Sequence, residues 1–251
     1  MTPMSSTWFL GDIHGCAEEL SDLVAKLELG QDDRLICLGD LYHRGPDPHG
    51  VAQILAATQQ VEIVFGNHEL VLLRRAGMMP LDLQSAPVSL PQGATGYDAH
   101  DLSGDGGTPM QNIQPDTSQE LLHLLERGRF LFRGDCTAGP FAGTPWLAVH
   151  AGVMPGKVAE DCSVEELCRV RRIGRRRTSP FWYEKYRGKE LVIFGHTHSQ
   201  LPRRHVRDGR LVAHGLDTGC VFGGCLTAWR IEDDEYEIVP ARRDWYADLV
   251  R

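Results

Sequence analysis

The chain has 251 residues, of which 42% are hydrophobic and spread evenly, so it can bury a substantial core within one compact domain. Its formal net charge of −8 argues against a general attraction to nucleic acid or to an anionic membrane, so local positive charge or metal ions must draw any phosphate-bearing ligand. No apolar stretch is long enough to span a bilayer, and the polar start of the chain lacks the basic and apolar regions of a secretory signal.

The first 75 residues alternate short apolar runs with helical patterns. Each run ends at a glycine followed by a polar residue, and the three expected strands are Thr7–Leu10, Arg34–Leu38 and Val61–Phe65. Between them, apolar residues recur at helical spacing over Glu18–Leu29 and Gly50–Thr58. This β-α-β-α-β-α order predicts the opening of a parallel α/β sheet.

From Gly77 to about Ser118 the periodicity is lost among Gly, Pro, Asp, Ser and Gln residues. A loop of this length inside a compact domain is usually a functional lid or a disordered insert. We expect a lid or cap insert at about 77–118, with plain disorder as the alternative.

Regular structure is expected to return with a helix over Ser118–Arg127 and then five strands. These strands are Trp146–Val149, Glu190–Phe194, Leu211–Ala213, Cys225–Ile231 and Tyr236–Val239. The last two flank the acidic turn Glu232–Glu235, which indicates an antiparallel hairpin. The second half therefore predicts a mixed sheet that packs on the first.

Five segments share one design, in which an apolar strand is followed at once by Gly or Ala and by metal-binding side chains. They are Gly11–Gly15, Gly39–Asp40, Gly66–Glu69, Val149–Gly152 and Gly195–His198. Ligands of open α/β sheets collect at the carboxyl ends of the strands, so these residues should converge. Oxygen and nitrogen donors without thiolate suit Mn²⁺, Fe or Zn²⁺. Two such ions, roughly 3.5–4 Å apart and bridged by one carboxylate, would supply hydroxide to attack a phosphorus centre.

Each of these segments alone is a weak signal. A Gly-Asp pair after a strand is usually an ordinary turn, and a lone His on an apolar segment is more often a hydrogen-bonded core residue. The functional interpretation rests on five segments in one order along a chain of suitable fold.

Taken together, the motifs resemble the metallophosphoesterases of the phosphoprotein phosphatase type, including bacterial diadenosine tetraphosphatases and the bacterial serine/threonine phosphatase branch. The matching motifs are Gly-Asp-Ile-His-Gly at 11–15, Gly-Asp-x-x-x-Arg-Gly at 39–45, Gly-Asn-His-Glu at 66–69, Val-His-Ala-Gly at 149–152 and Gly-His-Thr-His at 195–198. The run at 216–228 is similar to a signature of the bacterial branch. The resemblance covers nearly the whole chain outside the insert. It implies a single calcineurin-like α/β domain over residues 1–251, a four-layer α/β/β/α sandwich with mixed sheets.

The resemblance also implies a role for each matched residue. The metal ligands would be Asp12 and His14 on the first ion, Asp40 bridging both ions, Asn67, His150 and His196 on the second ion, and His198 as a further ligand of the first. His68 would protonate the leaving oxygen, and Arg44 would bind phosphate. Arg171 would be a second phosphate-binding arginine, although an expected tryptophan near it is replaced by Cys168 or Arg169.

One departure from the resembled pattern concerns the catalytic acid. Phosphoprotein phosphatases carry Asp before the Arg-Gly pair, where its charge orients and supports the catalytic histidine, whereas this chain has His43. An imidazole supplies no formal negative charge to keep His68 protonated, so His68 should be a weaker proton donor here. This difference favours an anhydride, whose leaving phosphate needs little protonation, over a phosphoserine. The alternative is that His43 is only a surface-loop residue.

The leading function is therefore hydrolysis of a dinucleoside polyphosphate of the diadenosine tetraphosphate type, with two divalent ions, manganese first and iron or zinc as alternatives. A serine/threonine protein phosphatase is the second hypothesis, and a nuclease-like phosphodiesterase is the third. A non-enzymatic phosphate-binding descendant would need a lost metal ligand, and none is missing. The expected partner is a phosphorylated small molecule or a phosphoprotein, and no membrane.

Several further features have two interpretations. The arginine-rich run Arg169–Arg177 is either a solvated face or an edge of the cleft, and in the second case nucleic acid remains open as a partner. Aromatic residues in Phe181–Tyr186 are more often core than a nucleobase platform. Asp217 is expected to organise a turn near the metals. The seven cysteines, with no Cys-x-x-Cys pair, predict reduced and mostly buried thiols in a cytoplasmic protein.

Overall fold

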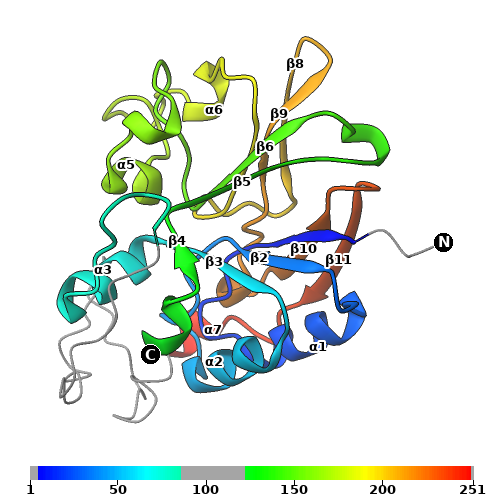
Figure 1. The fold of residues 1–251 in the computed structure, drawn as a ribbon. Coiled ribbons are helices and arrows are strands. Elements are labelled where there is room, and N and C mark those ends of the chain that lie inside the picture. The colour runs from blue at the N-terminus through cyan, green and yellow to red at the C-terminus, as the bar shows by residue number, and fades with distance from the viewer. Residues whose placement is uncertain (1–4, 86–121, 250–251) are drawn as a thin grey trace.

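The computed structural model describes residues 5–85 and 122–249. Two β-sheets pack face to face, and helices cover the outer side of each sheet (Figure 1). The layers therefore run helix, sheet, sheet, helix, which confirms the predicted α/β class and the four-layer sandwich with mixed sheets.

The first sheet has the strand order β11-β10-β1-β2-β3-β4. Its parallel strands are β1 (Thr7–Leu10), β2 (Arg34–Cys37), β3 (Val61–Val64) and β4 (Gly128–Arg129), and its antiparallel hairpin is β10 (Cys225–Arg230) with β11 (Glu235–Pro240). The outer face is covered by α1 (Ala17–Leu27), α2 (Pro48–Ala57) and α7 (Trp245–Leu249), and α3 (Asn67–Ala76) lies beside the β3–β4 edge (Figure 1). The predicted parallel opening and the predicted terminal hairpin are both confirmed.

The second sheet has the strand order β5-β6-β7-β9-β8. Its parallel strands are β6 (Pro145–Val149), β7 (Leu191–Phe194) and β9 (Arg210–Gly215), and its antiparallel edges are β5 (Leu131–Asp135) and β8 (Arg203–Arg207). The short helices α5 (Val164–Arg169) and α6 (Trp182–Lys185) lie on its outer side (Figure 1). The described residues also include three 3₁₀ turns: η2 (Gly139–Phe141), η3 (Ala159–Asp161) and η4 (Cys220–Phe222).

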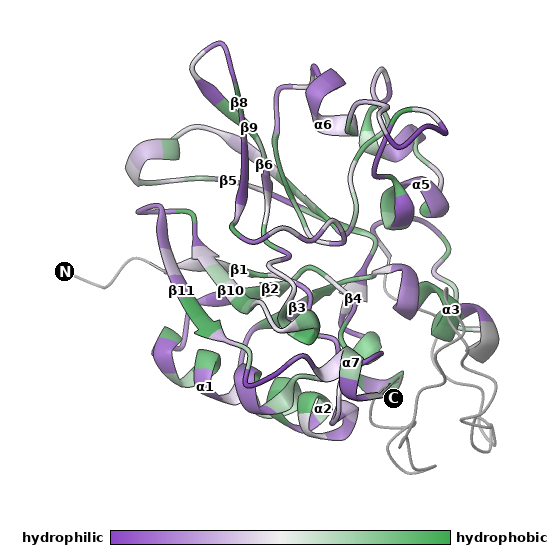
Figure 2. Ribbon diagram, turned by 180° about the vertical axis from the view of Figure 1, so that it is seen from behind, coloured by the Kyte–Doolittle hydropathy of each residue, from purple (hydrophilic) through white to green (hydrophobic). Residues whose placement is uncertain are grey.

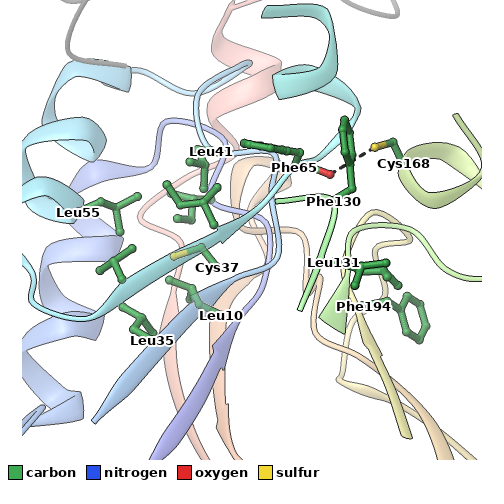
Figure 3. Close-up of a cluster of buried hydrophobic side chains, with 14 of the residues drawn as sticks. Leu10, Leu35, Cys37, Leu41, Leu55, Phe65, Phe130, Leu131, Cys168 and Phe194 are labelled. Atoms are coloured by element: carbon green, nitrogen blue, oxygen red, sulfur yellow. Dashed lines mark hydrogen bonds between the residues drawn. The ribbon is translucent and has the colours of Figure 1, made fainter. Parts of the chain in front are cut away.

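The central strands are apolar on both faces because both faces are covered. The buried hydrophobic residues form two clusters, and β1 contributes to both. Phe9 belongs to the cluster between the sheets, where its ring lies 5.1 Å from that of Trp146 between centroids. Leu10 belongs to the second cluster. Figure 3 shows Leu10 in that cluster together with Leu35, Cys37 and Leu55 from β2 and α2. These strands therefore appear in the sequence as continuous apolar runs rather than as alternating patterns, and their glycine-marked ends lie at the edge of the core.

Helix boundaries follow local capping. The helix predicted from Gly50 begins two residues earlier, at Pro48, because Asp47 caps it and accepts a hydrogen bond of 2.8 Å from the backbone N–H of Gly50. The helix predicted to continue to Leu29 ends at Leu27, and Glu28 takes a left-handed conformation with φ of 46°.

Three edge strands were not predicted: the two-residue β4 in the first sheet, and β5 and β8 in the second. β8 is hydrophilic along most of its length (Figure 2), since an edge strand with exposed alternate residues carries no apolar run. In β5 only Leu131 is buried, the other residues are partly buried or exposed, and Gly134 interrupts the pattern. Of the predicted helix Ser118–Arg127, residues 122–125 are helical, and the part before 122 lies outside the described residues. The same holds for the expected lid insert beyond residue 85.

All seven cysteines are free, six of them buried and Cys225 partly buried, as expected for reduced thiols. Within the described ranges, no helix combines the length and the apolar character required to cross a membrane.

Candidate active site

Every predicted ligand follows the carboxyl end of a strand. Asp12 and His14 follow β1, Asp40 follows β2, and Asn67 begins α3 after β3. From the second sheet, His150 follows β6, and His196 and His198 follow β7. Because these strand ends meet along one edge of the two sheets, residues 184 positions apart in the chain share one site: the backbone N–H of His196 donates to both carboxylate oxygens of Asp12 at 3.0 Å.

A cavity of about 410 Å³ opens at this edge. It is lined by Asp12, His14, Asp40, Arg44, Asn67, Arg169, Arg171, His196, His198, Asp217 and Phe222. His68 and His150 are buried against Asp40 instead. The cavity thus contains acidic, imidazole and guanidinium groups together with one phenyl ring.

Three polar atoms surround the Nε2 atom of His150. It lies 3.2 Å from Asn67 Oδ1, 3.2 Å from His196 Nδ1 and 3.3 Å from Asp40 Oδ1. The other ring nitrogen of His150 donates to the carbonyl of Leu38 at 2.6 Å, which assigns the proton of a neutral imidazole to Nδ1. A cation that displaced the proton from His150 Nε2 would satisfy all four atoms, the two oxygens and the two ring nitrogens.

A second group surrounds the other oxygen of Asp40. His14 Nε2 lies 3.6 Å and His68 Nε2 3.8 Å from Asp40 Oδ2. Arg44 Nη1 donates to His14 Nε2 at 3.0 Å, since a guanidinium can only donate. A cation bound to His14 would take this lone pair and leave Arg44 available to an anion in the cavity. Asp40 is the one residue shared by both groups of closely spaced ligand atoms, the position expected of a bridging carboxylate.

Two predicted ligands lie outside both of these groups. Asp12 lines the cavity but directs both oxygens at the backbone N–H of His196. His198 also lines the cavity, and its ring is exposed and packs 5.3 Å from the ring of Phe222. Asp217 organises its turn as expected, by accepting a hydrogen bond of 3.0 Å from the backbone N–H of Gly219.

The backbone at the site is strained. His14, Asp40, Arg44 and His196 all have positive φ, at 49°, 51°, 77° and 60°, a region that non-glycine residues seldom adopt. Gly39 has φ of 95°, and a Cβ there would lie 2.8 Å from His150 Nδ1. The fold therefore maintains unfavourable backbone at the residues that meet in the cavity, as is common at functional sites.

Glu69, for which the sequence suggested no role, holds the backbone around the candidate site in place. It is fully buried, and its Oε2 accepts from the backbone N–H groups of Asp40 and Gly66 at 2.8 and 3.0 Å. Its Oε1 accepts from Leu41 at 2.9 Å. One side chain thus joins the loop after β2 to the start of α3. Burial raises the pKa of Glu69 to about 7, and the nearby Asp40 carboxylate adds to this effect.

The two groups around Asp40 differ in charge. Burial lowers the pKa of His150, but the Asp40 carboxylate outweighs it and raises the pKa to about 10. Burial raises the pKa of Asp40, yet the surrounding imidazoles, His150 first, lower it well below its usual value. Burial lowers the pKa of both His14 and His68 to about 3. The cluster thus contains an anionic carboxylate amid imidazoles, of which His14 and His68 are neutral, a donor set suited to divalent cations.

His43 is buried, so the interpretation of it as a surface-loop residue is wrong. Its ring lies 4.3 Å from the ring of His68, with 41° between the planes. Residue 43 therefore contacts the candidate acid directly, and what it supplies there is an imidazole rather than a carboxylate.

The arginine run divides between the two predicted interpretations. Arg169 and Arg171 line the cavity, and Arg171 Nη2 donates to the carbonyl of His196 at 3.0 Å. Arg175, Arg176 and Arg177 are exposed and do not line it. In the following aromatic segment, Trp182, Tyr183 and Tyr186 are buried, which confirms the expectation of core packing. Beyond the cavity, Arg203, Arg204 and Arg207 are engaged by Tyr183, Asp234 and Tyr186, respectively.

In this two-sheet α/β fold, buried Asp, Asn and His side chains that could bind metal lie beside three arginines, an arrangement typical of metal-dependent hydrolases that act on phosphate. The chain belongs to the calcineurin-like phosphoesterase family, whose model matches residues 5–200. It is therefore a hydrolase of phosphoric esters or anhydrides.

Two of its relatives, which match over nearly their full length, carry related names. The chain is 25% identical to the asymmetrical bis(5'-nucleosyl)-tetraphosphatase PrpE of Halalkalibacterium halodurans, with 96% of each chain covered. It is 28% identical to the symmetrical bis(5'-nucleosyl)-tetraphosphatase of Serratia proteamaculans, with 95% of each covered. In fold, it is similar to a protein assigned as a diadenosine tetraphosphatase (TM-score 0.64, 24% identity, 96% and 95% covered). It is also similar in fold to a protein serine/threonine phosphatase of Saccharomyces cerevisiae (TM-score 0.54, 13% identity, 96% and 80% covered).

Proposed function

We propose that this protein hydrolyses a phosphoanhydride bond of a dinucleoside polyphosphate of the diadenosine tetraphosphate type. The observation that carries the proposal is the single cavity in which the ligand cluster around Asp40 meets the guanidinium groups of Arg44, Arg169 and Arg171. Arginine forks bind phosphate oxygens in pairs, and three of them suit a chain of phosphates better than a single one. The relatives named bis(5'-nucleosyl)-tetraphosphatase match over almost their whole length, which supports this substrate class.

Two divalent cations fit the donor set. Asp12, His14 and Asp40 would hold the first, and Asp40, Asn67, His150 and His196 would hold the second, with His198 at the cavity wall as a further candidate for the first. Nitrogen and oxygen donors without thiolate favour Mn²⁺, with Fe or Zn²⁺ as alternatives. Ions bound there would supply a hydroxide nucleophile near neutral pH and Lewis-acid stabilisation of the phosphoryl oxygens.

The remaining residues bind and orient the substrate. Arg44 would turn from His14 to the scissile phosphate, and Arg171, fixed by the carbonyl of His196, would bind from the other sheet. His68, beside Asp40, would pass a proton to the leaving oxygen. Because burial lowers the pKa of His68 to about 3, little of it is protonated near neutral pH, so this help is small. A nucleotide phosphate leaves as a stable anion, so a cavity with His43 in place of a carboxylate suits an anhydride.

The test is a side-by-side assay of the manganese-loaded protein with diadenosine tetraphosphate and with a phosphothreonine peptide. We expect kcat/KM for the dinucleotide to exceed that for the peptide. The products distinguish the two kinds of cleavage named among the relatives. Hydrolysis of diadenosine tetraphosphate by one water gives two ADP when it is symmetrical, and ATP and AMP when it is asymmetrical. A higher kcat/KM for the peptide would overturn the proposal and favour a protein phosphatase.

A further inference from the structure

The cavity contains one side chain that the chemistry of metal ions and phosphate does not explain. Phe222 lines it among charged and imidazole groups, and 36% of its surface is exposed. An apolar ring left open to solvent inside a polar cavity loses the benefit of burial unless a ligand covers it.

The ring of Phe222 is held in place from behind. It lies in η4, between Gly219 and Gly223, both left-handed with φ of 72° and 80°. The ring of Tyr246 from α7 packs edge-on against it, with 5.4 Å between centroids and 70° between planes. Because its backbone turn and its edge contact are both defined, the phenyl group presents a preformed surface to the cavity.

The groups beside Phe222 connect this surface to the phosphate-binding groups. The guanidinium carbon of Arg44 lies 5.9 Å from the centre of the ring, and the ring of His198 lies 5.3 Å away on the cavity wall. A phosphate bound by Arg44 would therefore place the organic group attached to it next to Phe222. A flat, polarisable group is the chemistry that gains most from such a surface, by stacking.

We propose that Phe222 is the platform on which a nucleobase of the substrate stacks, with His198 beside it and Arg44 on the attached phosphate. This inference rests on the proposed function, because it assumes that a nucleotide phosphate occupies the cavity. It deepens that function by assigning recognition of the base to η4, whereas the arginines of the cavity recognise only phosphate.

The experiment compares a nucleotide with its counterpart that lacks the base. Hydrolysis of p-nitrophenyl phosphate by the manganese-loaded protein serves as the reporter, and inhibition constants are measured for AMP and for ribose 5-phosphate. The variants are Phe222→Leu, Phe222→Trp, and Phe141→Leu as the matched control, since Phe141 is a partly buried ring that packs on Trp229 and does not line the cavity.

We expect wild type to bind AMP more tightly than ribose 5-phosphate. In Phe222→Leu this preference should fall by about five-fold or more, the lower end of what base stacking on an aromatic ring contributes. Phe222→Trp should retain it, and Phe141→Leu should not change it. An equal preference in wild type and Phe222→Leu would overturn the platform, as would wild type without any preference for AMP.

The failure of each proposal is recognisable separately. Wild type that hydrolyses the reporter but not diadenosine tetraphosphate would refute the proposed function, whereas the ratio of the two inhibition constants would still report on Phe222. Normal hydrolysis of the dinucleotide with unchanged ratios in Phe222→Leu would refute only the platform.

Discussion

Replacing Glu69 by glutamine tests whether this buried carboxylate organises the active site. The carboxylate accepts three backbone hydrogen bonds, from Asp40, Leu41 and Gly66, at 2.8 to 3.0 Å. Glutamine keeps the shape but offers only one accepting oxygen, so its amide nitrogen would face a backbone N–H. At least one charge-assisted bond is lost, and a buried donor is left unpaired.

We estimate the loss in the free energy of unfolding from the hydrogen bonds that the substitution removes. A hydrogen bond to a charged group contributes about 1.5–3 kcal/mol, so Glu69→Gln should lower the free energy of unfolding by about 2–4 kcal/mol. For a chain of this size, that loss lowers Tm by roughly 4–16 °C. Because the backbone of Asp40 loses its anchor, kcat should also fall by about ten- to hundred-fold.

The assay is thermal unfolding with and without manganese, because a metal ion that binds only the native state adds stability of its own. Glu62→Gln is the matched control: Glu62 pairs with Arg34 at 2.7 Å on the partly exposed surface of β3, and its loss should cost less than about 1 kcal/mol. Wild-type Tm and kcat in metal-free and metal-loaded Glu69→Gln would refute the reasoning.

Four further substitutions address the site and the core. Asp40→Asn and His150→Ala should each abolish hydrolysis and reduce bound metal while circular dichroism stays native, and activity retained with bound metal in either would contradict the proposed cluster. His43→Asp places a carboxylate beside His68, raises the pKa of that histidine and should improve kcat/KM for phosphothreonine more than for an anhydride; equal gains would contradict the leaving-group argument. Burial lowers the pKa of His214 to about 3. An unfolded histidine takes up its proton near pH 6.5, so the stability present above that pH should fall on acidification, by about 2 kcal/mol at pH 5. Chemical denaturation of His214→Gln should show a shallower decline, and an unchanged slope would exclude this histidine as the cause.

The sequence by itself determined the parts of the molecule that depend on local order. Buried parallel strands are continuous apolar runs, and the rule that ligands gather at their carboxyl ends was sufficient to select Asp12, Asp40, Asn67 and His150 as neighbours. The polar edge strand β8 was missed because it contains no apolar run from which a strand could be predicted. The ranges of the helices shifted by a few residues because capping, not periodicity, ends a helix.

Only the tertiary structure decided which groups beyond the motifs reach the site. Arg169 at the end of α5 and Phe222 in η4 line the cavity because the two sheets bring their strand ends together, and no local pattern encodes that meeting. Burial of His43 against His68 and the three backbone bonds of Glu69 likewise depend on how loops from β2 and β3 pack. Periodicity specifies a residue's own element, whereas contact across elements is a property of the packed chain.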